Sequence, residues 1–434
     1  MPDQRVKILW YLTAPDGPYP WEAAGRWETG FDHMRQLAVA IDRLGFHGAL
    51  LGTSSDDGLT TAAALAAETR TMRFLTAVYP GLVAPAKLAQ IARTIDRVSG
   101  ERLLFNVVNG NDPGMAGYGL HLDHDTRYDF SAEYWDAFQH VYQGELGSYR
   151  GKFTNIAARR NDDGPLSAWR HTFPGGKRAE LWGAGTSPAG VAHAVNLFDV
   201  YLSFADTPQR LGEKFRHVGA EAAKLGRTLR FGTRLQVVVR ETDEEAWDAA
   251  ARLLARTGVD TARALTARQF PPGQDVESYE PAPDADPKVI RRLAALRAGR
   301  LPDVRDLEIY PNVWAGPSMF GFDVVRPGAG LYLVGSAENV AARIREYRVH
   351  GTEAFILSGF PLITEAQRVA DLLFPLLDLD HGFDVPVLGE ASRGAAWDAG
   401  GKGAVGAASA AHRPAPAVGD GVSADTGLTL PVVV

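Results

Sequence analysis

The sequence contains no cysteine, and this absence excludes several kinds of chemistry at once. Disulfides, thiolate nucleophiles and cysteine-ligated metal sites cannot occur. No run of about 18 apolar residues is present, so no transmembrane helix is expected. The first residues also lack the apolar core of a signal peptide. We therefore expect a soluble, cytoplasmic protein.

The chain has no excess of positive charge and few of the common catalytic motifs. Its 434 residues carry a formal net charge of −7, with a pI of about 5.9. This charge favours neither nucleic acid nor an anionic membrane as a partner. The GxSxG, HExxH and Walker A patterns are absent, and no GxGxxG pattern joins a predicted strand to a helix. His121 and His124 have metal-ligand spacing but no matching third ligand, so we expect no metal site.

Short apolar runs alternate with segments of helical periodicity along most of the chain. The runs that are typical of strands cover residues 6–12, 47–53, 72–79, 102–110, 179–185, 199–204, 231–242 and 353–359. Near-continuous apolar strands with helical crossovers indicate a parallel sheet covered on both faces. Eight such strands predict an α/β fold, the closed (β/α)8 or TIM barrel. An open doubly wound sheet is the competing fold.

Two long insertions and a tail depart from a minimal barrel. The insertions cover residues 109–177 and 257–322, and both follow a strand, which places them at the C-terminal face of the barrel. Long loops at that face are often lids. Within the second, residues 271–288 are polar, acidic and proline-rich, so we expect them to be mobile. Residues 391–434 are rich in Ala, Gly and Pro and predict a disordered tail after a domain of residues 1–390.

The stretch WGAGTSPAG, residues 182–190, follows the fifth predicted strand and opens a helix. Gly185 allows close backbone approach, while Thr186 and Ser187 offer hydroxyls beside free N–H groups. This combination is a natural anion site. A tight turn with an ordinary N-cap explains the same residues equally simply.

Several other polar side chains could serve either a site or the fold. His124 and Tyr128 are four residues apart, so on a helix they share one face and could hold a phosphate or only pack. Asn106 and Asn109 end the fourth strand, as turn formers or as active-site donors. Arg326 lies in a Pro/Gly loop, where arginine is more often a surface residue.

Arg234 and Gln236 interrupt the otherwise apolar strand of residues 231–242. They are two residues apart, so they share a face of the strand. Arginine is almost never fully buried without a partner. The sequence therefore predicts either an anion in front of Arg234 or a structural salt bridge inside the barrel.

The order of several segments resembles the bacterial luciferase-like flavin monooxygenases, and most closely the two-component alkanesulfonate monooxygenases. The matching segments are ARTIDRVSGERLLFNVVNG, FGTRLQVVVRET, NVWAG, RPGAG and FILSGFP, within about residues 5–378. The resemblance implies a TIM barrel and FMN, used in its reduced form and supplied by a separate NAD(P)H-dependent flavin reductase. It further implies oxygen as co-substrate, sulfite and an aldehyde as products, and a homodimer or homotetramer.

The resemblance also assigns roles to residues. Gly185, Thr186 and Ser187 become the FMN phosphate loop, His124 and Tyr128 its neighbours, Asn106 and Asn109 contacts near the flavin ring, and Arg234 and Arg326 the cations of the substrate pocket. Two positions depart from the pattern: Gln236 replaces a histidine and Phe360 a tyrosine, so both would shape the pocket without titrating. A non-sulfonate substrate, a deazaflavin cofactor or a flavin-binding subunit without turnover are the alternatives.

Overall fold

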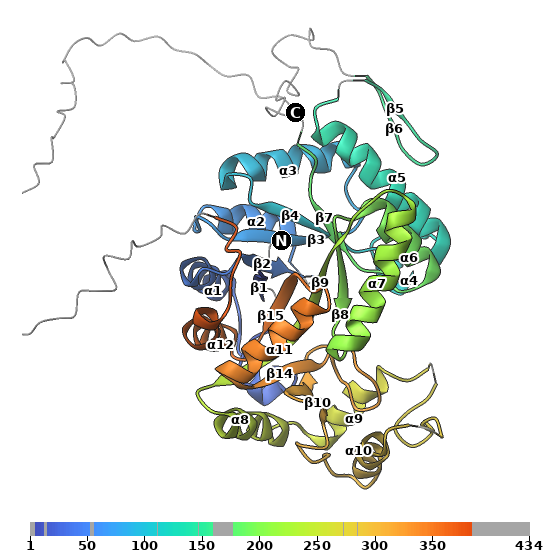
Figure 1. The fold of residues 1–434 in the computed structure, drawn as a ribbon. Coiled ribbons are helices and arrows are strands. Elements are labelled where there is room, and N and C mark those ends of the chain that lie inside the picture. The colour runs from blue at the N-terminus through green and yellow to red at the C-terminus, as the bar shows by residue number, and fades with distance from the viewer. Residues whose placement is uncertain are drawn as a thin grey trace, which may run out of the picture. The chain divides into compact units, whose positions relative to one another are not determined.

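Eight parallel strands close into a barrel at the centre of the protein (Figure 1). The structure is a computed structural model and describes residues 5–12, 15–52, 56–110, 112–145, 147–158, 177–271, 273–283 and 285–383. The barrel strands are β1 (Lys7–Tyr11), β2 (Gly48–Leu51), β3 (Arg73–Val78), β4 (Leu103–Val107), β7 (Leu181–Gly183), β8 (Val200–Phe204), β9 (Arg230–Arg240) and β15 (Ala354–Ser358). Strand β9 closes the ring, because it pairs with both β8 and β15. The predicted TIM barrel is confirmed.

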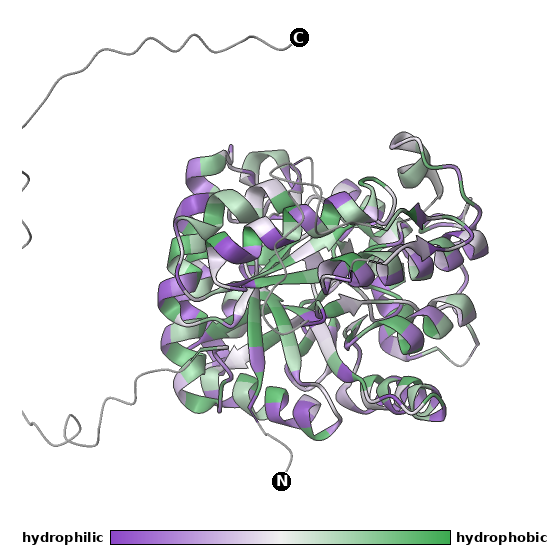
Figure 2. Cartoon of the chain, turned by 90° about the horizontal axis from the view of Figure 1, so that it is seen from above, coloured by the Kyte–Doolittle hydropathy of each residue, from purple (hydrophilic) through white to green (hydrophobic). Residues whose placement is uncertain are grey.

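Helices surround the barrel and cover the outer faces of its strands. They are α1 (Phe31–Leu44), α2 (Gly58–Ala66), α3 (Pro85–Ser99), α5 (His124–Tyr142), α6 (Pro188–Leu197), α7 (Pro208–Lys224), α8 (Asp243–Ala255), α11 (Ala337–Val349) and α12 (Leu362–Arg368). Figure 2 shows the consequence for composition: the central strands are mostly hydrophobic, whereas the helices carry both hydrophobic and hydrophilic faces. Such amphipathic helices bury only the stripe that faces the sheet.

Local sequence signals set the ends of several helices. Helix α1 ends at Gly45, whose φ of 82° lies in the left-handed region that glycine adopts without strain. Gly100 ends α3 in the same way, with φ of 74°. Helix α8 begins with a capping box, in which the Thr242 side chain accepts from the N–H of Glu245 and the Glu245 side chain accepts from the N–H of Thr242.

Strand β14 (Leu331–Ser336) was not among the predicted strands. It is buried and runs parallel to the C-terminal half of β9, from Gln236 to Arg240. It extends the barrel sheet together with β11 (Val313–Ala315) and β10 (Glu308–Tyr310), which pair antiparallel. The run LYLVGS is short and leads straight into α11, so hydrophobic periodicity alone gave a helix start and no strand.

The two insertions form small elements of their own. The first contains α4 (Asp112–Gly117), β5 (Tyr149–Arg150) and β6 (Asn155–Ile156). The second contains α9 (Val259–Ala267), α10 (Pro287–Arg297), β10, β11, β12 (Pro317–Ser318) and β13 (Gly321–Phe322), and α9 and α10 lie together with α8 at the bottom of Figure 1.

The described part of residues 271–288 is packed, where composition had suggested mobility. The ring of Tyr279 stacks on that of Phe270 with 4.5 Å between centroids, and Val276 is 2% exposed. The backbone carbonyl of Val276 also accepts from Arg297 of α10 at 2.9 Å. Few but well-placed apolar contacts therefore hold this segment. The predicted tail at 391–434 lies outside the described residues.

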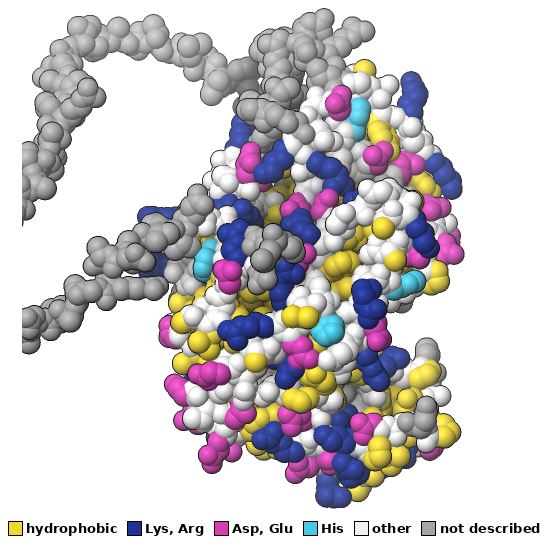
Figure 3. Space-filling view, in the orientation of Figure 1, with side chains coloured by type: hydrophobic (Ala, Val, Ile, Leu, Met, Phe, Trp, Pro, Cys, Tyr) yellow, Lys and Arg dark blue, Asp and Glu magenta, His cyan; other side chains and the backbone are white. Residues whose placement is uncertain are grey.

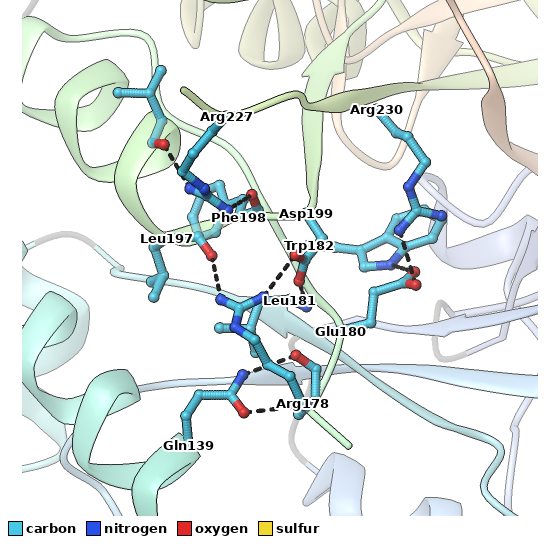
Figure 4. Close-up of polar contacts among 12 residues, drawn as sticks. Gln139, Arg178, Glu180, Leu181, Trp182, Leu197, Phe198, Asp199, Arg227 and Arg230 are labelled. Carbon is cyan, nitrogen blue, oxygen red and sulfur yellow. Dashed lines mark hydrogen bonds and ion pairs between the residues drawn. The ribbon is translucent and has the colours of Figure 1, made fainter. Parts of the chain in front are cut away.

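Polar contacts fix the position of β7 (Figure 4). The Gln139 side chain on α5 donates to the carbonyl of Ala179 at 2.8 Å and accepts from its N–H at 3.0 Å. The Asp199 carboxylate accepts from the Leu181 N–H at 2.8 Å and from Arg178 at 2.6 Å. These bonds lock the start of β7 to α5 and to the beginning of β8, and so fix where the strand ends at the opposite face of the barrel.

The carboxylate of Asp42 on α1 holds the turn before β3. It accepts from the backbone N–H groups of Arg70, Thr71 and Met72 at 2.9, 2.8 and 2.7 Å. Burial alone raises the pKa of Asp42, but the hydrogen bonds together outweigh it and lower the pKa below its ordinary value.

Replacing Asp42 with asparagine should therefore flatten the acid sensitivity of the fold. Because the folded pKa is lowered, the carboxylate stabilises the protein above the unfolded pKa, and this contribution is lost as pH falls through the folded pKa. We expect D42N to cost about 1 kcal/mol at pH 7, from weakened hydrogen bonds. The difference from the wild type should shrink below about pH 4. Thermal unfolding followed by circular dichroism across pH measures this, and an equal loss at every pH would contradict it.

Candidate active site

The two ends of the barrel are separated by an apolar layer. Side chains that point into the barrel form a buried cluster, namely Leu9, Tyr11, Leu50, Leu75, Leu104, Trp182, Val200, Ala354 and Ile356. Filled interiors of this kind are usual for eight-stranded barrels. A ligand at the C-terminal ends of the strands therefore has no route through the barrel to the other end.

Arg234 projects into the C-terminal end of the barrel. Its side chain is half-buried, and the Cζ atom lies 3.4 Å from the centroid of the Phe320 ring and 4.5 Å from that of Tyr11. Burial lowers its pKa to about 10, which the Tyr11 and Tyr332 hydroxyls partly oppose. The guanidinium therefore stays charged at neutral pH. Phe320 comes from the turn between β12 and β13 and covers one face of the cation.

Two nitrogens of Arg234 have no hydrogen-bond partner in the described part of the chain. Both Nε and Nη2 are buried, and together they form one edge of the guanidinium. No carboxylate among the described residues pairs with this arginine, which removes the salt-bridge interpretation there. Buried charge without a partner is costly. An edge with two parallel donors suits two oxygens of an anion.

Further polar atoms without partners surround this edge on the same strands. Gln236 is fully buried, and its Nε2 donates to the carbonyl of Ala329 at 3.2 Å while its Oε1 has no partner among the described residues. The Ser358 hydroxyl, on β15 opposite Gln236 in register, is also buried and unpaired within that part of the chain. Sequence reasoning found Gln236 but not Ser358, because a serine in an apolar strand carries no distinctive pattern.

The loop between β7 and α6 has the form of an anion-binding helix N-terminus. Ser187 is the N-cap, and its hydroxyl accepts from the Gly190 N–H at 3.1 Å. A Cβ on Gly185 would lie 2.7 Å from the Gly190 carbonyl, so no larger residue fits. Thr186 is exposed beside the free N–H groups. The structure confirms the capped turn, and phosphate binding at its open end stays a prediction.

His124 and Tyr128 lie beside this loop. Their rings contact edge to face at 5.1 Å, and the ring of Tyr128 lies 5.3 Å from that of His193 on α6. The hydroxyl of Tyr201, next to Tyr128, donates to the carbonyl of Gly185 at 2.8 Å. An aromatic stack thus joins the first turns of α5 to α6. The structure brings the predicted phosphate-side residues together.

His193 was missed by sequence analysis. Its Nε2 contacts the Ser131 hydroxyl at 3.0 Å, and its Nδ1 is buried without a partner in the described residues. Burial lowers its pKa to about 4, so the imidazole is neutral near pH 7. A helix with small residues on either side gave no signal for this histidine.

The two asparagines lie at the C-terminal end of β4, next to β7, which leads into the loop before α6. Asn106 is half-buried on β4, on the same inward face as Leu104 and opposite Trp182 in register. Asn109 follows β4, and its buried Oδ1 has no partner among the described residues. Side-chain amides here can donate to and accept from a polar ring.

Over residues 9–354 the sequence matches the family described as luciferase-like monooxygenases. The chain belongs to the luciferase-like monooxygenase family. The predicted resemblance is confirmed at that level. Within the described residues, no helix is long and apolar enough to cross a membrane, and no cluster of three or more His, Asp or Glu side chains could hold a metal ion.

Solved structures share this luciferase-like fold. A riboflavin lyase, solved with modified FMN and riboflavin, has a TM-score of 0.65 and 18% identity, covering 88% of this chain and 94% of its own. An EDTA monooxygenase from Chelativorans sp. BNC1 has a TM-score of 0.62 and 16% identity, covering 86% of this chain and 93% of its own. An F420-dependent secondary alcohol dehydrogenase, solved with an F420–acetone adduct, has a TM-score of 0.55 and 15% identity, covering 87% of this chain and all of its own. Such identities show a shared fold and leave the substrate open.

Arg326 and Phe360, two residues of the predicted pocket, differ in burial. Arg326 is exposed on the loop before β14, so it adds no buried cation beside Arg234. The interior place on that loop belongs to Asp323, which is 3% exposed and accepts from the Gly330 N–H at 2.8 Å. Phe360 is buried against the ring of Trp21 at 5.9 Å. Of the two arginines, only Arg234 has buried nitrogens among the described residues, and the role of Arg326 stays a prediction.

Other residues at the C-terminal end of the barrel were not predicted from the sequence. Phe204 ends β8 opposite Arg234 in register and is 53% exposed, an apolar surface at the rim. Burial raises the pKa of Asp323 to about 7, although the Gly330 and Gly328 N–H groups and Arg326 lower it. Strand alternation could have placed Phe204 with Val200 on the inward face. Asp323 and Phe320 lie in an insertion without periodicity, where no sequence signal exists.

Proposed function

We propose that this protein is a monooxygenase that uses reduced FMN and O2 to oxidise a small anionic molecule, with an organosulfonate as the first candidate substrate. The observation that supports this most directly is the buried Nε–Nη2 edge of Arg234, which has two donors and no partner among the described residues. The family match supports the reaction class. In the sulfonate case the products are sulfite and an aldehyde.

The described residues fit FMN as the cofactor. Gly185, Thr186 and Ser187 at the N-terminus of α6 would hold its phosphate, with His124 and Tyr128 beside it. Asn106 and Asn109 would contact the ring system. Bound reduced FMN would supply the electrons that activate oxygen. By resemblance, a separate NAD(P)H-dependent reductase delivers it, and the enzyme forms a homodimer or homotetramer.

The protein itself contributes orientation and charge. Arg234 holds two oxygens of the substrate anion along one edge, which fixes the distance of the reacting carbon from the cofactor. Its positive charge also stabilises negative charge that develops on oxygen during the reaction. The Phe320 ring, 3.4 Å from Cζ, keeps water from one face of the cation and so strengthens both effects.

The proposal is tested by mixing the full-length protein with photoreduced FMN, oxygen and a panel of sulfonates. We expect sulfite to appear in proportion to flavin oxidised for at least one sulfonate. Carboxylate and phosphonate analogues of equal chain length belong in the same panel. Product from these alone would move the substrate to another anion, and no product from any anion would reject the proposed function.

A second candidate is an oxidation that does not cleave a sulfonate, with FMN or a deazaflavin. The departures at Gln236 and Phe360 favour it, because neither side chain can exchange a proton near pH 7. The similar F420-dependent dehydrogenase shows that this fold accommodates such a cofactor. Fluorescence titration with FMN and with F420, under the same conditions, separates the two by affinity.

Replacing Gln236 with histidine should restore a titrating group to the pocket. We expect kcat/KM of Q236H to change with pH near pH 6 to 7, about where an imidazole titrates. In the wild type, position 236 should cause no such change. Gln236→Asn is the matched control, since it changes size without adding a titrating group. Identical pH profiles for Q236H and the wild type would show that position 236 does not contact the reacting atoms.

A further inference from the structure

The innermost layer at the N-terminal end of the barrel is charged. Lys7 on β1, Arg73 on β3, Glu180 just before β7 and Arg230 on β9 come from alternate strands of the barrel. In barrels of this kind, alternate strands contribute the four side chains of one layer, and branched apolar residues are usual there. Three cations and one carboxylate therefore replace what is ordinarily part of the apolar core.

A hollow opens over this layer, which we call the basal hollow. Its volume is about 510 Å³, within the range of small-molecule sites. It is lined by Arg5, Lys7, His47, Arg73, Leu104, Glu180, Arg230, Asp380, Gly382 and Phe383. In Figure 3, Lys and Arg side chains gather around the place where Figure 1 marks the beginning of the chain.

Both carboxylates of the basal hollow already have partners. Glu180 accepts from Arg230 at 2.9 Å and from the Trp182 indole at 2.6 Å, as Figure 4 shows. Asp380 accepts from Lys7 and from the Gly382 N–H at 2.8 Å. The pKa of each carboxyl group is lowered, although burial acts against this in both, so both remain ionised. They leave little capacity for a further cation.

The lining holds more cations than carboxylates, namely Arg5, Lys7, Arg73 and Arg230 against Glu180 and Asp380. Arg73 has a neutral acceptor, the Gly382 carbonyl at 2.6 Å, and no carboxylate partner among the described residues. Burial lowers the pKa of His47, and the fields of Arg73 and Lys7 lower it further despite the opposing bonds to Asp380. The pKa of His47 therefore depends on the charges of Arg73 and Lys7.

The basal hollow is separate from the candidate active site. The apolar layer from Leu9 to Trp182 fills the barrel between them, and Leu104 of that layer forms part of the wall of the hollow. A small anion bound here would not reach Arg234. The lining is almost entirely polar, which distinguishes it from a site for an apolar substrate tail.

We propose that the basal hollow binds a phosphate-class oxyanion: inorganic phosphate, pyrophosphate or a phosphate monoester. Arg73 has no carboxylate partner among the described residues, and its planar fork provides parallel donors for two oxygens of such an anion. Lys7 and Arg230 lie in the same layer and contribute attraction more than geometry. This site lies outside the proposed catalytic function and does not depend on it.

The test uses the full-length protein with carbon-13-labelled histidine and follows ring resonances during titration with each of the three anions. His47 reports on the basal hollow and His193 on the loop before α6, each assigned from its loss in H47Q and H193Q. We expect the ring resonances of His47 to shift saturably with at least one anion. The anion that binds most tightly identifies the chemical source of the phosphate group. Arg73→Gln should weaken that binding about tenfold or more, as the loss of a charge-assisted hydrogen bond implies.

Arg216→Gln is the matched control, because Arg216 is an exposed arginine on α7 outside the hollow. It should leave the affinity at His47 unchanged. Sodium chloride at equal ionic strength should not reproduce the shift. The proposal is overturned if His47 stays unshifted, if chloride shifts it equally, or if R73Q binds as tightly as the wild type. A shift at His193 alone would place phosphate only at the active-site loop and would likewise overturn it.

Discussion

Replacing Arg234 with methionine is expected to lower kcat/KM for the anionic substrate by about 10²- to 10³-fold while leaving the melting temperature unchanged or higher. The loss in activity follows from removing one partner of a buried charge pair in the substrate complex. The stability effect has the opposite sign because the free protein buries the cation without a partner. Methionine has similar length and can pack against Phe320. Steady-state kinetics and differential scanning calorimetry on the same preparation measure both effects.

Two variants control this result. Arg326→Met removes an exposed arginine of the same type from the neighbouring loop, and we expect at most a few-fold change in kcat/KM. Arg234→Lys keeps the charge but loses the two-donor edge, so activity should fall between the wild type and R234M. A lower melting temperature of R234M would instead indicate a structural cation. If R234M and R326M lowered kcat/KM equally, Arg326 would have to contact the substrate as Arg234 does.

Replacing Gly185 with valine is expected to weaken binding of reduced FMN about 10- to 100-fold. A Cβ at this position would lie 2.7 Å from the Gly190 carbonyl oxygen, and this backbone atom cannot rotate away as a side chain could. The loop must shift, and the N–H groups at the start of α6 then no longer point at one phosphate. Anaerobic titration of reduced FMN, followed by quenching of protein fluorescence, gives the affinity.

The control for the loop is Gly147→Ala. Gly147 is exposed, and a Cβ there meets nothing within 4 Å, so the affinity for FMN should not change. Comparing FMN with riboflavin sharpens the result, because riboflavin lacks the phosphate. G185V should narrow the difference between the two flavins, whereas a general loss of folding would weaken both alike. An unchanged preference for FMN in G185V would place the phosphate elsewhere.

Hydrophobic periodicity predicted the architecture because each barrel strand and its helix carry their own signal. The eight strands, the glycine at the end of α1 and the anion-binding form of the loop before α6 could all be derived from short segments. The pairing of Arg234 and Gln236 on one face followed from strand alternation alone. Strand β14 was missed because its short run of four apolar residues, Leu331–Val334, leads into a helix and has no period of its own.

The sequence by itself determined the barrel, the family and the presence of Arg234 and Gln236 on one face of an apolar strand, since these depend on patterns within one segment. Only the tertiary structure decided that Arg326 stays outside while Asp323 takes the interior position, that Phe320 covers Arg234, and that Lys7, Arg73, Glu180 and Arg230 meet in one layer. Those facts depend on how segments hundreds of residues apart approach each other. Charge neighbours across a closed barrel are set by its register and by the packing of its insertions, which no local pattern encodes.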